Sequence, residues 1–257
     1  MSDAKPTGST HVQALVPNAM VLAAGLGRRM RHLSQTRPKP LTPLAGRALL
    51  DRVLDRLAAA GVQDVVVNVH YMAEQIERAV ADRDPQRPRI SISDERDNLL
   101  DTGGGVVRAL PQLGPKPFFI HNSDSVWWQG LGDNLVDMAR AWDAEQMDTL
   151  LMLAPTATAI GYDGRGDFLL DAGGQIQRRP EREDAPFVFT GVSLAHPRLF
   201  DDAPRGAFSL NWAWNRAIDA NRAYGFRMSG VWMHVGTPEA LAEAETLLRD
   251  DQQSHEW

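Results

Sequence analysis

The 257-residue chain contains no cysteine. This absence excludes disulfide bonds, zinc sites built on cysteine thiolates, and catalysis by a thiol nucleophile. A cysteine-free chain fits a reducing compartment, and we expect a cytoplasmic protein. A chain of this length buries enough apolar surface for an independent core, so no disulfide or structural metal is needed to hold it together.

Long apolar runs and an excess of positive charge are also missing. No segment approaches the roughly 20 apolar residues of a membrane-spanning helix, and residues 1–18 lack the apolar core of a secretory signal. The formal net charge is −6, whereas binding along a nucleic-acid backbone needs a basic surface. We therefore expect no membrane partner and no nucleic-acid partner. The expected assembly is a monomer or a small homo-oligomer.

The first half of the chain alternates between strand-like and helix-like segments. Short apolar or β-branched runs are separated by segments with apolar residues at helical spacing. This alternation predicts an α/β fold with a Rossmann-like, mostly parallel sheet sandwiched by helices. The expected strands are residues 19–24, 64–70, 89–95 and 117–124, and the expected helices are 48–61, 72–82 and 102–113.

The second half is richer in strands, which predicts a β-rich insertion in the same domain. Gly173 and Gly174 mark a hairpin turn, and Thr237 followed by Pro238 marks the start of a last helix. We expect one domain over residues 19–249, between tails at 1–18 and 250–257. The expected strands are 148–155, 166–179 (a hairpin), 187–197 and 231–236, and the expected helices are 208–221 and 237–250.

A loop-like stretch after the first expected strand concentrates glycine and positive charge. Residues 22–41 read LAAGLGRRMRHLSQTRPKPL, with two glycines, a cluster of arginines and a lysine between prolines. A dinucleotide-binding G-x-G-x-x-G motif is disfavoured because Met30 occupies the third glycine position and no acidic residue follows the second strand. A P-loop is excluded because no segment matches G-x-x-x-x-G-K-[ST].

A third interpretation is a loop that binds a nucleoside triphosphate. Gly25 and Gly27 would let backbone N–H groups approach phosphate oxygens closely. Arg29 would neutralise the β and γ phosphates, and Lys39 would present its ammonium from a backbone stiffened by the flanking prolines. A glycine turn with a solvated basic loop is the plainer alternative. The combination of Arg29 with Lys39 favours the triphosphate loop.

The pattern LAAGLGRRM followed by RPKPLTPLAGRALL resembles the signature of the sugar-1-phosphate nucleotidyltransferases. The resemblance extends over about residues 19–249. It implies an enzyme that joins an NTP and a sugar 1-phosphate into a nucleotide sugar and pyrophosphate. It also implies a nucleotide-binding half at about 19–148 and a sugar-binding half at about 149–249. The segments DTGGG, GRGDF, FTGVSLAHP and VGTPEALAEAE narrow the resemblance to short bacterial members that use UTP and N-acetylmuramate α-1-phosphate in peptidoglycan recycling.

The resemblance assigns catalytic roles to Arg29, Lys39 and Asp124. Asp124 follows an expected strand in HNSD, where the family has its metal-binding aspartate. A carboxylate that leaves room for water ligands suits Mg²⁺, and a divalent ion offsets the repulsion between an anionic sugar phosphate and the α-phosphate. We therefore expect Mg²⁺ as the cofactor, with Mn²⁺ or Co²⁺ as alternatives.

His234 is the sharpest departure from the family pattern. The family commonly shows W-x-D-V-G-T-P, with the aspartate as a second metal ligand, whereas this chain has WMHVGTP. Imidazole is a poor ligand for Mg²⁺ and a better one for Mn²⁺ or Co²⁺. Three alternatives stay open: His234 binds a metal directly, holds a metal-bound water, or plays no part.

The remaining expected contacts come from other segments of the family pattern. DTGGG resembles a loop that closes over a pyrimidine base, and its glycines would offer free N–H groups at the positive end of a helix. GRGDF and FTGVSLAHP would hold the sugar, with hairpin turns as the plainer alternative. The expected nucleotide contacts are Ala23, Ala24, Gly25, Gly27, Arg29, His70, Asp101, Thr102 and Gly103, and the expected sugar contacts are Gly166, Asp167, Thr190, Gly191 and Asn211.

The implied reaction is a direct in-line displacement without a general base, because the attacking sugar phosphate is already ionised. Guanylyl transfer to mannose 1-phosphate and thymidylyl or uridylyl transfer to glucose 1-phosphate remain alternatives within the family. A catalytically silent nucleotide-sugar sensor is an alternative of another class. His234 favours the sensor, whereas Arg29, Lys39 and Asp124 favour the enzyme.

Overall fold

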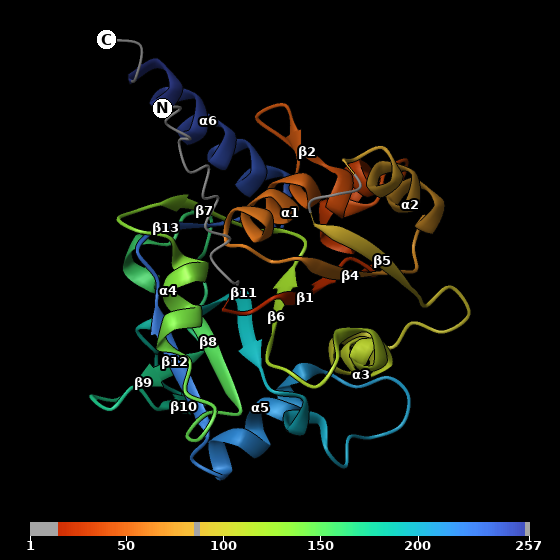
Figure 1. Ribbon diagram of the computed structural model, residues 1–257. Coiled ribbons are helices and arrows are strands. Elements are labelled where there is room, and N and C mark those ends of the chain that lie inside the picture. Colours follow the sequence, from red (N-terminus) through yellow and green to blue (C-terminus); the bar gives the residue numbers. More distant parts are fainter. Residues whose placement is uncertain (1–14, 85–87, 255–257) are drawn as a thin grey trace, which may run out of the picture.

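A mixed sheet of nine strands forms the centre of the structure, a computed structural model that describes residues 15–84 and 88–254 (Figure 1). Its strands are β1 (Asn18–Leu22), β4 (Asp64–Val69), β5 (Arg89–Asp94), β6 (Phe118–Asn122), β8 (Thr149–Pro155), β9 (Phe168–Leu170), β10 (Ile176–Arg178), β11 (Phe187–Ala195) and β12 (Ala223–Arg227). β5, β4, β1 and β6 lie next to one another in that order and run parallel. The expected α/β fold with a Rossmann-like sheet is confirmed.

Antiparallel strands from the second half of the chain extend this sheet. β11 pairs with β6, β8 and β9, while β9 and β10 form the hairpin expected around Gly173 and Gly174. The register of β11 against β8 shifts between Phe189 and Ser193, and Gly191 in this bulge has φ +92°. The β-rich region therefore continues the parallel sheet.

Helices cover both faces of the sheet, because successive side chains of a strand point to opposite sides. The helices around it are α1 (Leu49–Ala59), α2 (Ala73–Ala81), α3 (Asp101–Leu113), α4 (Asn134–Ala141) and α5 (Leu210–Asp219). On β4, Val65 and Val67 belong to the core beneath α1, α2 and α4, whereas Val66 belongs to the core beneath α3 and α5. Figure 1 shows α1 and α2 above the strands and α3 below them.

A third, smaller core lies under the last helix. Met30, Leu44, Val126 and Leu241 are buried together there, which packs the end of the chain against the loops that follow β1. Thr237 caps this helix by accepting a hydrogen bond from Ala240 N–H, as its position predicted. The elements of this region are η1 (Arg28–Ser34), η2 (Lys39–Leu41), β2 (Pro43–Leu44), β3 (Arg47–Ala48), β7 (Ser125–Gln129), β13 (Gly230–His234) and α6 (Pro238–Ser254), and two further turns are η3 (Thr156–Thr158) and η4 (Pro197–Phe200).

The structure corrects several expected boundaries. β7, α4 and β12 lie in segments for which the sequence patterns predicted no element. The expected N-terminal tail is ordered at its end, because Val16 is buried and Asn18 begins β1. The last helix continues through Ser254 into the expected C-terminal tail. Residues 1–14 and 255–257 lie outside the described range. No helix in the described range has both the length and the apolar character needed to cross a membrane.

Candidate active site

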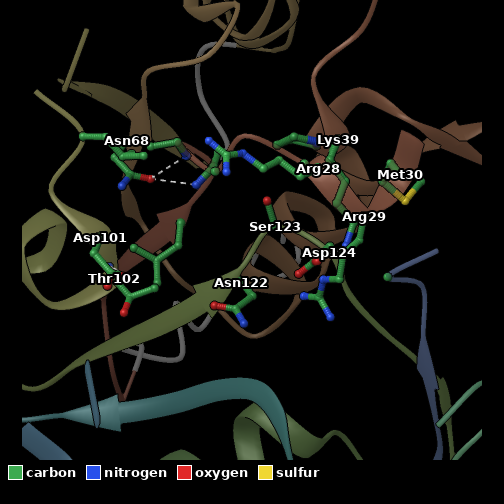
Figure 2. Close-up of a pocket in the computed structure, with 18 residues that line it drawn as sticks. Arg28, Arg29, Met30, Lys39, Asn68, Asp101, Thr102, Asn122, Ser123 and Asp124 are labelled. Carbon is green, nitrogen blue, oxygen red and sulfur yellow. Dashed lines mark hydrogen bonds and ion pairs between the residues drawn. The ribbon is translucent and has the colours of Figure 1, made fainter. Parts of the chain in front are cut away.

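A cavity of about 590 Å³ opens at the sheet edge where β1 and β6 end. Leu22 and Asn122, the last residues of these two strands, form part of its wall. Ligands of open α/β sheets gather at the carboxyl ends of the parallel strands. Figure 2 shows side chains of three segments around the cavity: Arg28, Arg29 and Lys39 on one side, Asp101 and Thr102 on the other, and Asn122, Ser123 and Asp124 between them.

The glycine loop leaves its backbone open to this cavity. A Cβ added to Gly25 would meet no protein atom within 4 Å, so the space beside it is free. Gly27 has φ +61°, and its carbonyl accepts a hydrogen bond from Met30 N–H at 2.9 Å. Only glycine adopts that left-handed conformation without strain. Both glycines line the cavity, which is the arrangement that a phosphate-binding loop requires.

Asn68 holds the start of the glycine loop in place, and sequence reasoning missed it. Its side-chain oxygen accepts hydrogen bonds from Ala23 N–H at 2.6 Å and Ala24 N–H at 3.3 Å. Figure 2 draws both bonds. Its amide nitrogen donates to Glu95 Oε1 at 2.7 Å. Ala23 and Ala24 therefore line the cavity with N–H groups that are already bonded. An asparagine within a run of valines was the available signal, because a buried polar side chain needs partners.

Three cationic side chains border the cavity. Arg28 and Arg29 are exposed at the start of η1, and Arg28 was not among the expected contacts. Lys39 is the first residue of η2, where Pro38 before it is extended (φ −67°, ψ 145°) and Thr42 N–H donates to its carbonyl. The Lys39 ammonium forms an ion pair with Asp124, and its side chain is only 12% exposed. The prolines thus fix the backbone beside the cation, as the RPKPL pattern predicted.

Asp124 lies in the tight connection between β6 and β7. Its side chain retains 31% exposure and faces the cavity. Burial acts to raise the pKa of Asp124, but the positive charge of Lys39 and its hydrogen bond outweigh burial, so the pKa lies below its usual value. Asp124 is therefore an ionised carboxylate at neutral pH, at the wall of a cavity bordered by cations.

His234 lies one strand away from Asp124. β13 pairs with β7 so that His234 is opposite Ser125, the neighbour of Asp124. Its ring packs against Gly236, a cavity residue, at a place where a Cβ on that glycine would stand 2.4 Å from Nε2. Burial lowers the pKa of His234, and the charges of Lys39 and Arg29 lower it further. The imidazole is neutral at neutral pH.

The donor set fits Mg²⁺ better than a metal held by protein ligands alone. The described part of the chain holds no group of three or more histidine, aspartate or glutamate side chains able to bind an ion. Mg²⁺ keeps several waters and is bound through one or two carboxylates together with substrate phosphates. Asp124 supplies such a carboxylate beside a cavity with room for phosphates.

Asp101 and Thr102 form the opposite wall, where DTGGG predicted a contact with the base. Asp101 has φ +59°, and its carboxylate accepts a hydrogen bond from Thr102 N–H at 2.6 Å. Thr102 Oγ1 accepts from Leu210 N–H at 2.9 Å, which joins α3 to the start of α5. Both residues line the cavity, and their contact with a base stays a prediction.

The glycine run after Thr102 is packed against other segments of the protein and leaves no open space for a ligand. Gly103 N–H donates to Phe208 O at 2.8 Å, and Gly104 N–H points to the same carbonyl. A Cβ on Gly103 would stand 2.4 Å from the Phe208 ring, and one on Gly105 would stand 2.7 Å from Glu95 Oε1. The N–H groups of Gly103 and Gly104 are therefore not the free donors that the sequence predicted. Gly103 does not line the cavity.

The structure does not bring the other expected contacts to the wall of this cavity. His70 Nδ1 forms a hydrogen bond with Glu95 O at 2.7 Å. Thr190 is buried, and its hydroxyl donates to Met152 O at 2.9 Å. Asp167 accepts from Phe189 N–H at 2.9 Å, and a Cβ on Gly166 would clash with Ala185 O at 2.1 Å. The contacts of Thr190, Asp167 and Gly166 hold the β-rich region together, and a contact of these residues with a sugar stays a prediction.

Gly191 and Asn211 do not line the cavity, but each lies next to a residue that contacts its wall. A Cβ on Gly191 would meet Asn122, a cavity residue, at 3.0 Å. Asn211 follows Leu210, the residue bonded to Thr102. Both therefore stand just behind the wall formed by Asn122 and Thr102.

Comparison with known proteins also indicates a nucleotidyltransferase. A family model for the MobA-like NTP transferase domain matches residues 19–152. The N-acetylmuramate alpha-1-phosphate uridylyltransferase of Caulobacter vibrioides is 46% identical over 234 residues, which cover 90% of this chain and 97% of that protein. The protein of that name from Neisseria meningitidis serogroup B is 34% identical, with 89% and 97% covered.

Solved structures share the fold at lower identity. UDP-glucose pyrophosphorylase complexed with UDP-glucose matches with a TM-score of 0.74 at 14% identity, over 92% of this chain and 99% of that one. HddC from Yersinia pseudotuberculosis complexed with GMP-PN matches with a TM-score of 0.73 at 20% identity, over 91% and 100%. The chain belongs to the MobA-like NTP transferase family and is a nucleotidyltransferase, in the group that includes the N-acetylmuramate alpha-1-phosphate uridylyltransferases.

Proposed function

We propose that the protein transfers the uridylyl group of UTP to N-acetylmuramate α-1-phosphate, giving the UDP-sugar and pyrophosphate, as a cytoplasmic enzyme of peptidoglycan recycling. The observation that carries this proposal is the cavity in which Arg28, Arg29 and Lys39 border the ionised Asp124. The names of the relatives at 46% and 34% identity support the choice of nucleotide and sugar.

The chemical step is a displacement at the α-phosphorus. A phosphate oxygen of the sugar 1-phosphate forms the new P–O bond, and the bond to the oxygen that bridges to the β-phosphate breaks. Pyrophosphate leaves with the electron pair of that bond. No general base is required because the attacking oxygen is already ionised. Rate enhancement comes from positioning and from fixed charges near the transferred group.

We assign the cations of the cavity to the phosphates. Arg28 and Arg29 bind the β and γ phosphates next to the glycine loop, where guanidinium groups form paired hydrogen bonds with phosphate oxygens. Lys39 binds between the α-phosphate and the incoming sugar phosphate. Its ion pair with Asp124 keeps the ammonium in one place until the substrates arrive.

We further propose that Asp124 holds Mg²⁺. An ion held there would offset the negative charge that accumulates between the two phosphates. His234, neutral and set behind Gly236, would hold a water of the ion rather than ligate Mg²⁺ itself. EDTA should stop turnover, and added Mg²⁺ or Mn²⁺ should restore it. Full activity in EDTA would contradict the metal assignment.

The two halves of the chain divide the substrates in this proposal. Residues 19–148 bind the nucleotide, with Asp101 and Thr102 next to the base. Residues 149–249 bind the sugar, with Gly191 and Asn211 behind the cavity wall as its nearest candidates. The sheet runs across this division, because β11 pairs with β6. The two proposed halves therefore share one sheet.

A substrate panel tests the function directly. Pyrophosphate release should be measured for UTP, GTP, dTTP and CTP, each with the 1-phosphates of N-acetylmuramate, N-acetylglucosamine, glucose and mannose. The highest kcat/KM is expected for UTP with N-acetylmuramate α-1-phosphate. A preference for GTP with mannose 1-phosphate, or for glucose 1-phosphate, would replace the proposed substrates. No release from any pair with Mg²⁺ or Mn²⁺ would favour a non-catalytic nucleotide-sugar sensor.

A further inference from the structure

Within the proposed sugar-binding half, one arginine has no acidic partner among the residues that the structure describes. Arg178, the last residue of β10, donates from Nη2 to Asn211 Oδ1 at 2.8 Å and from Nε to Asn215 Oδ1 at 2.9 Å. β10 thereby joins the first turns of α5, which lies beside it in Figure 1. Both partners are neutral carboxamides, so the guanidinium charge is not compensated by them.

No aspartate or glutamate in the described ranges forms an ion pair with Arg178. Asp167 is the carboxylate whose charge acts on it, but that side chain accepts from Phe189 N–H. Burial lowers the pKa of Arg178, and Asp167 opposes this only in part. A half-buried cation with neutral partners is costly unless an anion joins it.

Two aromatic rings lie next to the guanidinium of Arg178. Its carbon lies 4.8 Å from the centre of the Phe168 ring and 5.8 Å from that of Trp214. Stacking of this kind favours arginine over lysine and pre-orients the group. Of the five N–H donors of an arginine, only the two described above have a partner in the described part of the chain. The others are available to a ligand.

Two short paths connect Arg178 to the wall of the cavity. Asn211 follows Leu210, whose N–H donates to Thr102 of the wall. On the other side, the Trp214 ring packs 4.7 Å from the Phe189 ring, two residues before the Gly191 bulge that contacts Asn122 of the wall. Arg178 is therefore linked on two sides to residues that contact the wall of the cavity.

We propose that Arg178 binds the carboxylate of an acidic sugar phosphate, namely the lactyl ether carboxylate of N-acetylmuramate α-1-phosphate. This inference rests on the proposed function and adds the residue that sets its sugar specificity. N-acetylglucosamine α-1-phosphate is the same sugar without the lactyl group. A planar guanidinium matches a carboxylate through two parallel hydrogen bonds, which a neutral sugar cannot offer.

The test compares Arg178→Gln with the unchanged protein on three sugar phosphates: N-acetylmuramate α-1-phosphate, its lactyl methyl ester, and N-acetylglucosamine α-1-phosphate. The unchanged protein should prefer the free acid to the ester. Arg178→Gln should lower kcat/KM for the acid by about 10- to 100-fold, mainly through KM, since hydrogen bonds to charged groups contribute about 1.5–3 kcal/mol. It should leave the ester and the neutral sugar within about threefold. Arg178→Lys should recover part of the loss on the acid.

Arg179→Gln is the matched control. Arg179 is the next residue, and its guanidinium donates to the backbone carbonyls of Gly166, Pro180, Glu181 and Glu183. Any effect of this variant should fall equally on the acid, the ester and the neutral sugar.

The outcomes separate this inference from the proposed function. Equal losses on all three sugars in Arg178→Gln, with a lowered Tm, would reduce Arg178 to a structural role and overturn the inference. An unchanged kcat/KM on the acid would overturn it as well. In both cases turnover of the acid by the unchanged protein would leave the proposed function standing. If the unchanged protein does not use the acid at all, the proposed function fails and the inference falls with it.

Discussion

Two glycine segments lie near the cavity. The glycine loop at residues 25–27 precedes the helical turn η1, and the glycine run at residues 103–105 lies in the first turn of α3. The two segments differ in which atoms lie next to them. A Cβ on Gly25 would meet no protein atom within 4 Å, whereas one on Gly104 would stand 2.4 Å from Gly206 O. In the loop, the missing side chain leaves room for a ligand. In the run, it leaves room for another segment of the protein. The neighbour of a glycine, more than its sequence pattern, decides its role.

Asn68 connects the two glycine segments. Its oxygen accepts from the N–H groups of Ala23 and Ala24, and its nitrogen donates to Glu95. The space beside Gly105 is filled by these same Asn68 and Glu95 side chains. Close packing of the glycine run therefore keeps the Asn68 side chain in place, and this side chain in turn positions the glycine loop. The glycine run at residues 103–105 thus helps to hold the glycine loop at residues 25–27 in its conformation.

The largest effect on activity is expected at Lys39, the positive charge next to the glycine loop. Lys39→Ala should lower kcat/KM by roughly 150-fold, since removal of one fixed charge from the reacting phosphates costs about 3 kcal/mol. Steady-state pyrophosphate release measures it, and the far-ultraviolet circular dichroism spectrum should not change. Lys116→Ala, at an exposed lysine remote from the cavity, is the control. Activity of Lys39→Ala within threefold of the unchanged protein would refute the assignment.

The connection between the two segments is tested by Asn68→Ala. The change leaves the buried N–H of Ala23 without its acceptor and removes the donor to Glu95, at a cost of about 3 kcal/mol in the free energy of unfolding. For a domain of this size, Tm should fall by about 6–12 °C, and kcat/KM should fall with it. Asn98→Ala, whose side chain is exposed, should change neither quantity. Reduced activity at an unchanged Tm would mean that Asn68 contacts substrate instead of supporting the loop.

The packed segment is tested by Gly104→Ala. The new methyl group would press on Gly206 O, and overpacking of this kind costs about 1–3 kcal/mol. We expect a lower midpoint in urea unfolding, with KM for UTP changed little in the fraction that folds. Gly173→Ala is the control, because the nearest atom to its added Cβ is the Asp171 carboxylate at 3.4 Å. Unaltered stability of Gly104→Ala would remove the contrast between the segments.

The smallest effect is expected at the open loop itself. Gly25→Ala adds a methyl group to free space, so its Tm should stay within about 1 °C of the unchanged protein. The same methyl group would crowd a bound triphosphate, which should raise KM for UTP at least about fivefold. Isothermal titration with UTP gives the binding effect separately from catalysis. A lower Tm without a change in UTP affinity would place Gly25 among the packing glycines.

Sequence reasoning did well where local pattern decides structure. β4 follows from its run of β-branched residues, α1 from apolar residues at helical spacing, and the cap at Thr237 from its position before Pro238. The loop with Gly25, Gly27, Arg29 and Lys39 was identified from residue types and spacing. Each of these features depends on residues within about fifteen positions of one another.

Other parts of the site depend on partners far along the chain. The pairing of β7 with β13 joins residues about a hundred positions apart, and no local pattern marks it. Asn68 acts on Ala23 across 45 positions, and Arg178 on Asn211 across 33. A single sequence carries no signal for such pairs beyond a polar residue in an apolar run. Arg28 was missed for another reason: its neighbour Arg29 matches the family pattern, and only the cavity shows that both side chains border it.

By itself, the sequence determined the α/β alternation, the cationic glycine loop and the absence of thiol chemistry, because composition and short-range spacing are sufficient for these. Only the tertiary structure decided which glycines face open space, which N–H groups are already bonded, and that Arg178 has no acidic partner in the described part of the chain. The physical reason is that available space and unpaired charge belong to a position in the fold. They are set by whichever distant residues pack there, as Phe208 does against Gly103.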